Sequence, residues 1–143
     1  MFDLRDQPDD LRRQLERVGR QTGHPAEAVF LVFYAMIVAG RGLSDEWWAP
    51  ADRRTIPEDA PVRHLTAVEV CDAVCRCARA RVGAEARRYF RHFGLRTGAD
   101  VGRVVYALVA EGLGATAPGD RPEQFDRVPL LKLLNPIADP DED

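Results

Sequence analysis

The sequence predicts a mostly α-helical protein whose C-terminal part follows the order of a winged helix. Apolar residues recur at helical spacing in five stretches, and a glycine follows each of them. After the last stretch come two short apolar pieces separated by a turn signal, which predict a β-hairpin. The predicted fold class is therefore a helical bundle with a winged-helix-like C-terminal part: three helices and a short hairpin within residues 64–128.

Residues 8–42 predict an N-terminal helical pair. In the first helix, about residues 8–20, Leu11, Leu15 and Val18 recur at helical spacing. Gly23-His24-Pro25 breaks the pattern, and a second helix is expected over about residues 25–39. Its apolar residues cover more than one face, so we expect it to be buried, or half covered by a partner.

Residues 43–62 form a Pro-rich loop without helical or strand periodicity. Loops of this length are uncommon in compact domains unless they have a function. The loop contains the adjacent pair Trp47 and Trp48. These side chains either fold back onto the core or stay exposed as an interface anchor, since Trp is enriched among binding hot spots.

The predicted winged-helix-like core begins at a capping box, Thr66 followed by Glu69. The helix behind it extends to about Val82, and shorter helices are expected over about residues 84–93 and 99–111. The two pieces of the hairpin are residues 113–116 and 124–128, with Pro118-Gly119-Asp120 as the turn between them.

The remaining residues, 129–143, predict a docked segment followed by an acidic tail at 139–143. The length of 143 residues suits one domain. We therefore expect a single domain over residues 1–138, with the tail outside it.

Several features within residues 63–128 resemble a family of small, functionally uncharacterised bacterial proteins. The carrying features are Arg63-His64 before the capping box, the Gly83 helix break, the turn at 93–97, and the following Asp100, Gly102, 105–109, Gly112-Leu113, Asp120 and Phe125. These motifs are mostly structural. The resemblance implies a similar fold and supplies no catalytic residue.

Composition excludes several classes of protein. A formal charge of −3 gives the whole chain no preference for nucleic acid or membrane. The longest apolar run, 26–40, is shorter than the ~20 residues that span a bilayer, and it lacks the basic-then-apolar start that is typical of a signal peptide. The expected location is therefore cytoplasmic.

The three cysteines, Cys71, Cys75 and Cys77, do not form a secreted disulfide framework or a four-ligand zinc pattern. Cys71 and Cys75 fall on an apolar stripe, where a reduced thiol packs as a small hydrophobe. We expect no metal and no cofactor.

No motif indicates catalysis. His24, His64 and His92 share no spacing, and no pattern places a catalytic partner within hydrogen-bond reach of any of them. His64 lies before a helix start, where it could brace the capping box. The protein is therefore predicted not to be an enzyme.

Arginines concentrate in the segment from 76 to 103, where only Glu85 and Asp100 oppose them. They are Arg76, Arg79, Arg81, Arg87, Arg88, Arg91, Arg96 and Arg103. Such a face could follow a phosphate backbone. The alternative is a solvated face that is partly paired with the acidic N-terminal residues and the acidic tail.

The third predicted helix argues against sequence-specific DNA binding. Among its outward-facing residues, only Arg103 is suited to contact bases or phosphates. The small residues Ala107 and Ala110 instead suit close approach of another helix or chain. We therefore predict a non-enzymatic protein-interaction module, with a homodimer as one form of partner. The alternative is nucleic-acid or ribonucleoprotein binding, not sequence-specific, through the arginine face. The predicted interaction residues are Trp47, Trp48, Arg76, Arg79, Arg87, Arg88, Arg91 and Arg103.

Overall fold

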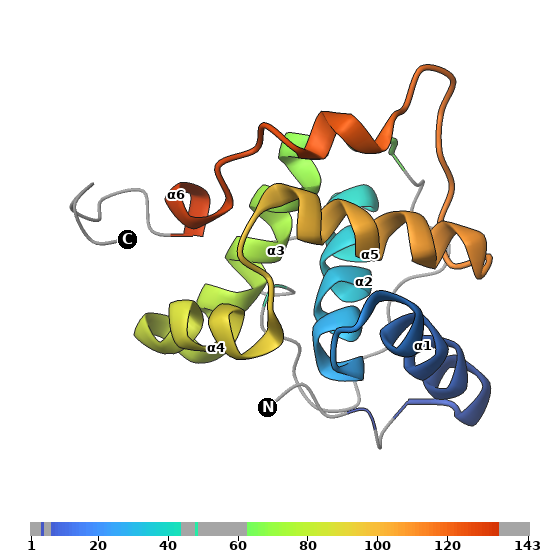
Figure 1. The fold of residues 1–143 in the computed structure, drawn as a ribbon, viewed down its shortest axis with the longest axis horizontal. Coiled ribbons are helices and arrows are strands. Elements are labelled where there is room, and N and C mark those ends of the chain that lie inside the picture. Colours follow the sequence, from blue (N-terminus) through green and yellow to red (C-terminus); the bar gives the residue numbers. More distant parts are fainter. Residues whose placement is uncertain (1–3, 5–6, 44–47, 49–62, 135–143) are drawn as a thin grey trace.

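Helix α2 (Ala26–Gly40) lies at the centre of the molecule (Figure 1). The fold is a computed structural model, which describes residues 4, 7–43, 48 and 63–134. The other elements in chain order are α1 (Asp9–Thr22), α3 (Ala67–Val82), η2 (Gly83–Glu85), α4 (Ala86–Phe93), α5 (Gly98–Ala110), η3 (Pro122–Phe125) and α6 (Leu130–Leu134). Helices α1, α3 and α5 pack around α2, while α4 and α6 pack on α3. The prediction of a mostly helical protein is confirmed.

The central position of α2 follows from its sequence, which is apolar on nearly every face. Val29, Val32, Ala35 and Val38 are fully buried among α1, α3 and α5. α1 meets α2 across a bend of 113° at the Gly23-His24-Pro25 break. Most of the second predicted helix is thus buried within the chain itself, while Phe33, Met36 and Ile37 are half-exposed.

Two helices begin at capping boxes. Thr66 accepts a hydrogen bond from the Glu69 backbone N–H, and the Glu69 carboxylate accepts one from the Thr66 N–H. Thr97 and Asp100 make the same reciprocal pair at the start of α5. The first box was predicted from the sequence, and the second was not recognised because its N3 residue is Asp rather than Glu.

The predicted β-hairpin is wrong, and with it the winged-helix-like C-terminal part. No strand is present among the described residues. Residues 113–117 are non-helical and are not paired with another segment as a strand. The second predicted strand is replaced by η3 and the turn after it. Phe125 and Val128 are both buried. Because side chains three residues apart point to opposite faces of a strand, that shared burial requires a helical turn.

Phe125 fixes η3 against α5. Gly102, on α5, leaves space for the Phe125 ring, since a Cβ at that position would lie 2.6 Å from Phe125 Cγ. The ring also meets Tyr106 edge-on at a centroid distance of 6.3 Å. Pro122 at the first position of η3 fixes a φ that suits helix entry.

After η3 the chain crosses α3, and the part of it that the structure describes ends with α6. Leu130 and Leu134 are buried, and the Arg79 guanidinium on α3 donates from Nη1 to the carbonyl oxygens of Leu133 and Leu134, both at 2.7 Å. The arginine therefore binds two C-terminal carbonyls of a short helix. The predicted acidic tail, 139–143, lies outside the described residues.

A membrane-spanning helix would need to be longer and more apolar than any single one described here. Only α1 and α2 taken together, across their bend, reach that length and composition.

Candidate functional site

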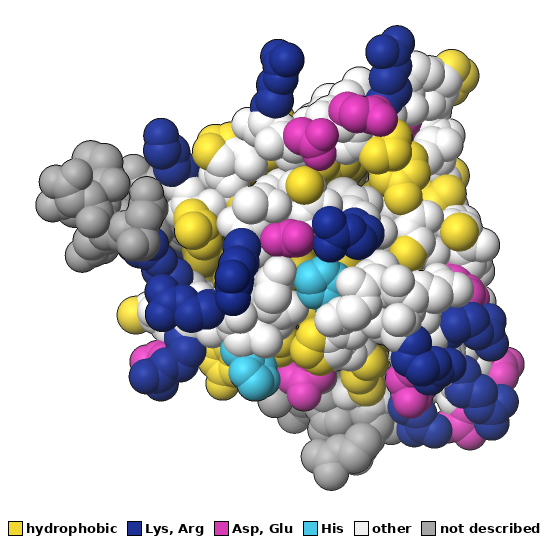
Figure 2. Space-filling model, in the orientation of Figure 1, with side chains coloured by type: hydrophobic (Ala, Val, Ile, Leu, Met, Phe, Trp, Pro, Cys, Tyr) yellow, Lys and Arg dark blue, Asp and Glu magenta, His cyan; other side chains and the backbone are white. Residues whose placement is uncertain are grey.

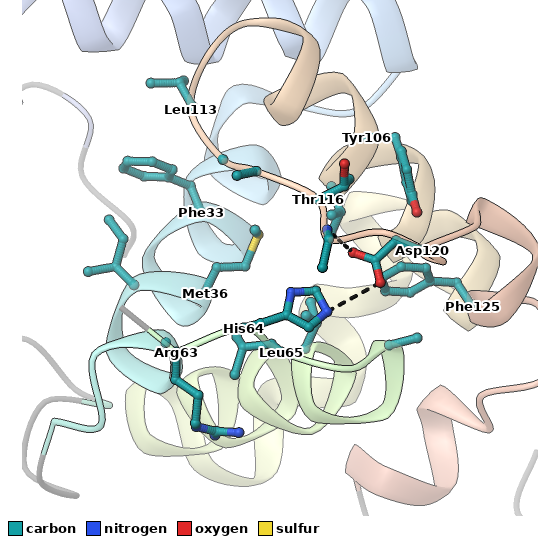
Figure 3. A pocket seen from close by; sticks show the side chains of 18 of the residues that line it. Phe33, Met36, Arg63, His64, Leu65, Tyr106, Leu113, Thr116, Asp120 and Phe125 are labelled. Atoms are coloured by element: carbon teal, nitrogen blue, oxygen red, sulfur yellow. Dashed lines mark hydrogen bonds and ion pairs between the residues drawn. The ribbon is translucent and has the colours of Figure 1, made fainter. Parts of the chain in front are cut away.

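A half-open pocket of about 380 Å³ lies between α2, the start of α3, α5 and the chain that follows α5 (Figure 3). The central helix supplies Phe33, Met36 and Ile37 to its lining. Residues 113–117 and Asp120 form one wall, and residues 63–65 lie on the opposite side. The volume is at the lower end of the ~300–1,000 Å³ of ligand pockets.

The floor of the pocket is apolar. Val70 and Val105 are buried, while Phe33, Met36 and Leu65 remain half-exposed at the pocket surface. α2 is hydrophobic on more faces than α1, α3 and α5 cover, and its remaining face is the pocket floor. An apolar floor with a few polar groups above it is typical of binding sites.

The polar groups gather around Asp120. Its Oδ2 accepts a hydrogen bond of 2.8 Å from the Ala117 backbone N–H, and its Oδ1 lies 3.2 Å from His64 Nε2. In Figure 3 the His64 ring points across the pocket to Asp120. Burial raises the pKa of the Tyr106 phenol, and the negative charges of Asp120 and Glu123 raise it further.

Arg63 belongs to the opposite wall, where its Nη1 lies 2.6 Å from Glu69 Oε2. The Thr66 N–H bond and the Arg63 guanidinium both favour the carboxylate, and they lower the pKa of Glu69 below its usual range. Arg63 therefore braces the capping box, in the role suggested for His64. His64 instead connects the two walls.

The polar groups do not form a catalytic arrangement among the described residues. No hydroxyl or thiol there is hydrogen-bonded to His64, although Thr116 lines the same pocket. No group of three or more described His, Cys, Asp or Glu residues could hold a metal ion.

The cysteines lie in the core, away from this pocket. Cys71, Cys75 and Cys77 are free thiols with no exposed surface, and burial raises the pKa of each to about 12. The core position predicted for Cys71 and Cys75 is confirmed. A thiol with so high a pKa is neither a nucleophile nor a ready metal ligand near neutral pH.

Among the predicted interaction residues that the structure describes, none lines the main pocket. Arg76 lies 2.9 Å from Asp72, Arg88 lies 3.4 Å from Glu85, and Arg103 lies 3.5 Å from Asp100. Arg79 is bound to the end of α6. Figure 2 shows Lys and Arg side chains spread over one face with Asp and Glu between them, and one group near α4.

The α4 group consists of Arg87, Arg88 and Arg91. Arg88 and Arg91 are exposed, and Arg91 has no ion pair within the described parts of the chain. Of the acidic N-terminal residues, the described Asp9 and Asp10 pair with Arg12 and Arg13 on α1.

Of the two tryptophans, Trp47 lies outside the described residues. Trp48 is half-buried against the core, and its carbonyl oxygen accepts a hydrogen bond of 3.2 Å from the Cys77 thiol. Trp48 also contributes to a smaller pocket of about 230 Å³ with Leu43 and Ala73. This residue therefore folds back onto the core.

Sequence reasoning missed the pocket because its two walls are far apart in the chain. His64 and Asp120 are separated by 56 positions, and no local pattern connects them. Two other outward positions of α5 are covered within the chain, while Ala110 remains exposed. Gly102 is covered by Phe125, and Glu111 at the end of α5 lies 2.9 Å from Arg17 of α1.

No protein-family model matches the chain, and neither curated proteins nor solved structures gave a match. The resemblance of residues 63–128 to a bacterial family therefore stays a prediction.

Proposed function

We propose that this protein is a non-enzymatic protein-interaction module that holds an apolar segment of a partner protein in the main pocket. One observation carries the proposal. Phe33, Met36 and Ile37 belong to the central helix of a small bundle, yet they are left half-exposed at a pocket of about 380 Å³. Apolar side chains on a central helix are ordinarily covered.

Covering this floor would stabilise a complex by the hydrophobic effect, at about 25 cal/mol per Å² of apolar surface removed from water. Arg41, Arg63, His64 and Asp120 around the lining would orient the bound segment. The predictions of a homodimer and of a cytoplasmic location are kept as part of the proposal, with a second copy of the chain as one partner. Size-exclusion chromatography with light scattering measures the oligomeric state directly.

The proposal is tested by selecting ligands from a library of random short peptides displayed on phage, with the full chain as bait. Selected peptides are then titrated by fluorescence anisotropy against wild type, Ile37→Lys and Val68→Lys. Ile37 lines the pocket, whereas Val68 is 54% exposed on α3 and does not line it. We expect peptide affinity to fall roughly tenfold or more in Ile37→Lys and to stay unchanged in Val68→Lys.

Ala115→Lys is a second pocket variant, chosen because Ala115 is exposed on the wall and its substitution leaves the core untouched. Circular dichroism checks the fold of each variant. Enrichment of no peptide, or equal binding to wild type, Ile37→Lys and Ala115→Lys, would contradict the proposed function.

A second proposal, nucleic-acid contact without sequence specificity, is favoured by the exposed arginines of α4. Titration of mixed DNA and RNA at two salt concentrations tests it, with the triple variant Arg87/Arg88/Arg91→Ala as the comparison. Under the first proposal nucleic-acid binding is weak and the triple variant retains the selected peptide. Tight, steeply salt-dependent binding that the triple variant loses would make the second proposal the main account.

A further inference from the structure

Resting on the proposed function, we infer that the partner segment binds in an extended conformation and pairs, as an added strand, with the backbone of Gly114–Thr116. This stretch is called the open wall below. The partner is a polypeptide with apolar side chains at alternate positions and few basic residues. Three observations carry this inference: the unpaired backbone of the wall, its position beside the apolar floor, and the charge of the lining.

The backbone of the open wall has no hydrogen-bond partner. Gly114, Ala115 and Thr116 are exposed, and none of their N–H or C=O groups bonds to any described residue. The first internal bond after them is the Ala117 N–H to Asp120, which begins the turn. A row of free donors and acceptors is the template to which an extended peptide adds a strand.

The open wall runs directly beside the apolar floor. A Cβ built on Gly114 would lie 3.6 Å from Met36 Cε, so the wall lies next to this side chain of α2. In Figure 1 the chain after α5 rises as an open run before it turns back toward η3. Because alternate side chains of a strand point the same way, an added peptide would direct every second side chain onto the floor.

The charges of the pocket lining favour a neutral or acidic segment. Two arginines, Arg41 and Arg63, and one acid, Asp120, line the pocket; Arg63 is paired with Glu69 at the start of α3, and His64 lies beside Asp120. A basic peptide would meet the arginines, and like-charge contacts disfavour a complex.

Other ligands would use only part of this site. A helical peptide satisfies its backbone groups internally and would leave the open wall unpaired. A small apolar molecule could cover the floor, but it offers no repeating donors and acceptors for Gly114–Thr116. An extended segment satisfies both the floor and the wall.

The test uses a peptide selected as above, bound to the full chain. Two N-methylated versions are made, one modified at alternate backbone nitrogens and the other at the intervening ones. An added strand directs only one of these sets of N–H groups to the wall. We therefore expect one version to lose roughly tenfold or more in affinity and the other to bind nearly as the parent does.

Hydrogen exchange of the protein supplies an independent readout. Peptide binding should protect amides within Gly114–Thr116, and Val68→Lys should show the same protection. A peptide with added flanking lysines should bind more weakly than one with added glutamates.

Different results would contradict strand addition and the proposed function. One result would overturn strand addition while the proposed function stands. In it, the peptide binds Ile37→Lys more weakly than wild type, both N-methylated versions bind wild type as the parent peptide does, and the open-wall amides stay unprotected. Selection of no peptide at all would remove the proposed function itself.

Discussion

The chain after α5 divides into two regions that behave differently. The open wall, Gly114–Thr116, leaves its backbone unpaired and exposed. The region from η3 to α6 closes over α5 and α3 and buries Phe125, Val128, Leu130 and Leu134. Both regions lack a strand partner within the described chain, yet only one of them is packed.

The difference lies in side-chain volume. The closing region has a large apolar side chain every two to four residues, and each finds a place on a helix surface. The open wall has Gly, Ala and Thr, which offer little apolar surface to offset the entropy of docking. Asp120 instead ends the wall: its carboxylate accepts a hydrogen bond from the Ala117 N–H and lies 3.2 Å from His64 Nε2.

Phe125→Ala should produce the largest change, because it removes the main anchor of the closing region. Loss of a buried aromatic ring is expected to lower the free energy of unfolding by about 3–5 kcal/mol. The matched variant Phe33→Ala removes a half-exposed ring from the pocket floor and should cost only about 1 kcal/mol. Urea unfolding measures both, and equal losses would contradict the distinction between the two regions.

Gly102→Ala tests the contact between η3 and α5. The added Cβ would lie 2.6–2.9 Å from three atoms of Phe125, and such overpacking costs about 1–3 kcal/mol, more than the helix propensity gained. Gly114→Ala is the control, since its Cβ would meet neighbours at 3.4 and 3.6 Å and should shift stability by no more than about 0.5 kcal/mol. Thermal and urea unfolding compare them. A stable Gly102→Ala protein would show that η3 is not packed as described.

Asp120→Ala should free the end of the open wall. The Ala117 N–H loses its acceptor and His64 loses its partner, at a cost of about 1 kcal/mol. We expect faster hydrogen exchange of the Ala117 amide, measured by NMR. Asp120→Asn keeps an acceptor for that amide and should restore most of its protection. Unchanged exchange in Asp120→Ala would mean that the wall is held by other contacts.

Glu69→Gln should have the smallest effect on the free energy of unfolding. The effect should be confined to the side of the pocket opposite the open wall. The folded-state pKa of Glu69 lies below its usual value of about 4.5, so its stabilising effect is present above that pH and is lost as pH falls through the folded-state value. The side chain is 38% exposed, so the loss should be about 0–1 kcal/mol. Unfolding curves of wild type and Glu69→Gln should converge in acid. A constant difference from neutral to acid pH would contradict this assignment.

Much of the fold could be predicted from local patterns. The five long helices, the capping box at Thr66 and the burial of Cys71 each follow from signals within a few residues. The hairpin could not be excluded in this way, since local spacing does not show that Phe125 and Val128 are both buried. Its true state depends on Gly102, which lies more than twenty residues away and leaves space for Phe125.

The candidate site was still less predictable. The arginines noted in the sequence are divided by the fold among different tasks: Arg79 caps α6, Arg76, Arg88 and Arg103 pair with neighbouring acids, and Arg91 remains exposed. His64 and Asp120 come together only because α3 and the turn after the open wall reach the same side of α2.

The sequence by itself determined the helices and the apolar character of α2, because hydrophobic periodicity and capping act over a few residues. Only the tertiary structure decided which face of α2 stays uncovered and which backbone stays unpaired. Those properties depend on how well distant side chains fill the space between elements, and local spacing does not contain that information.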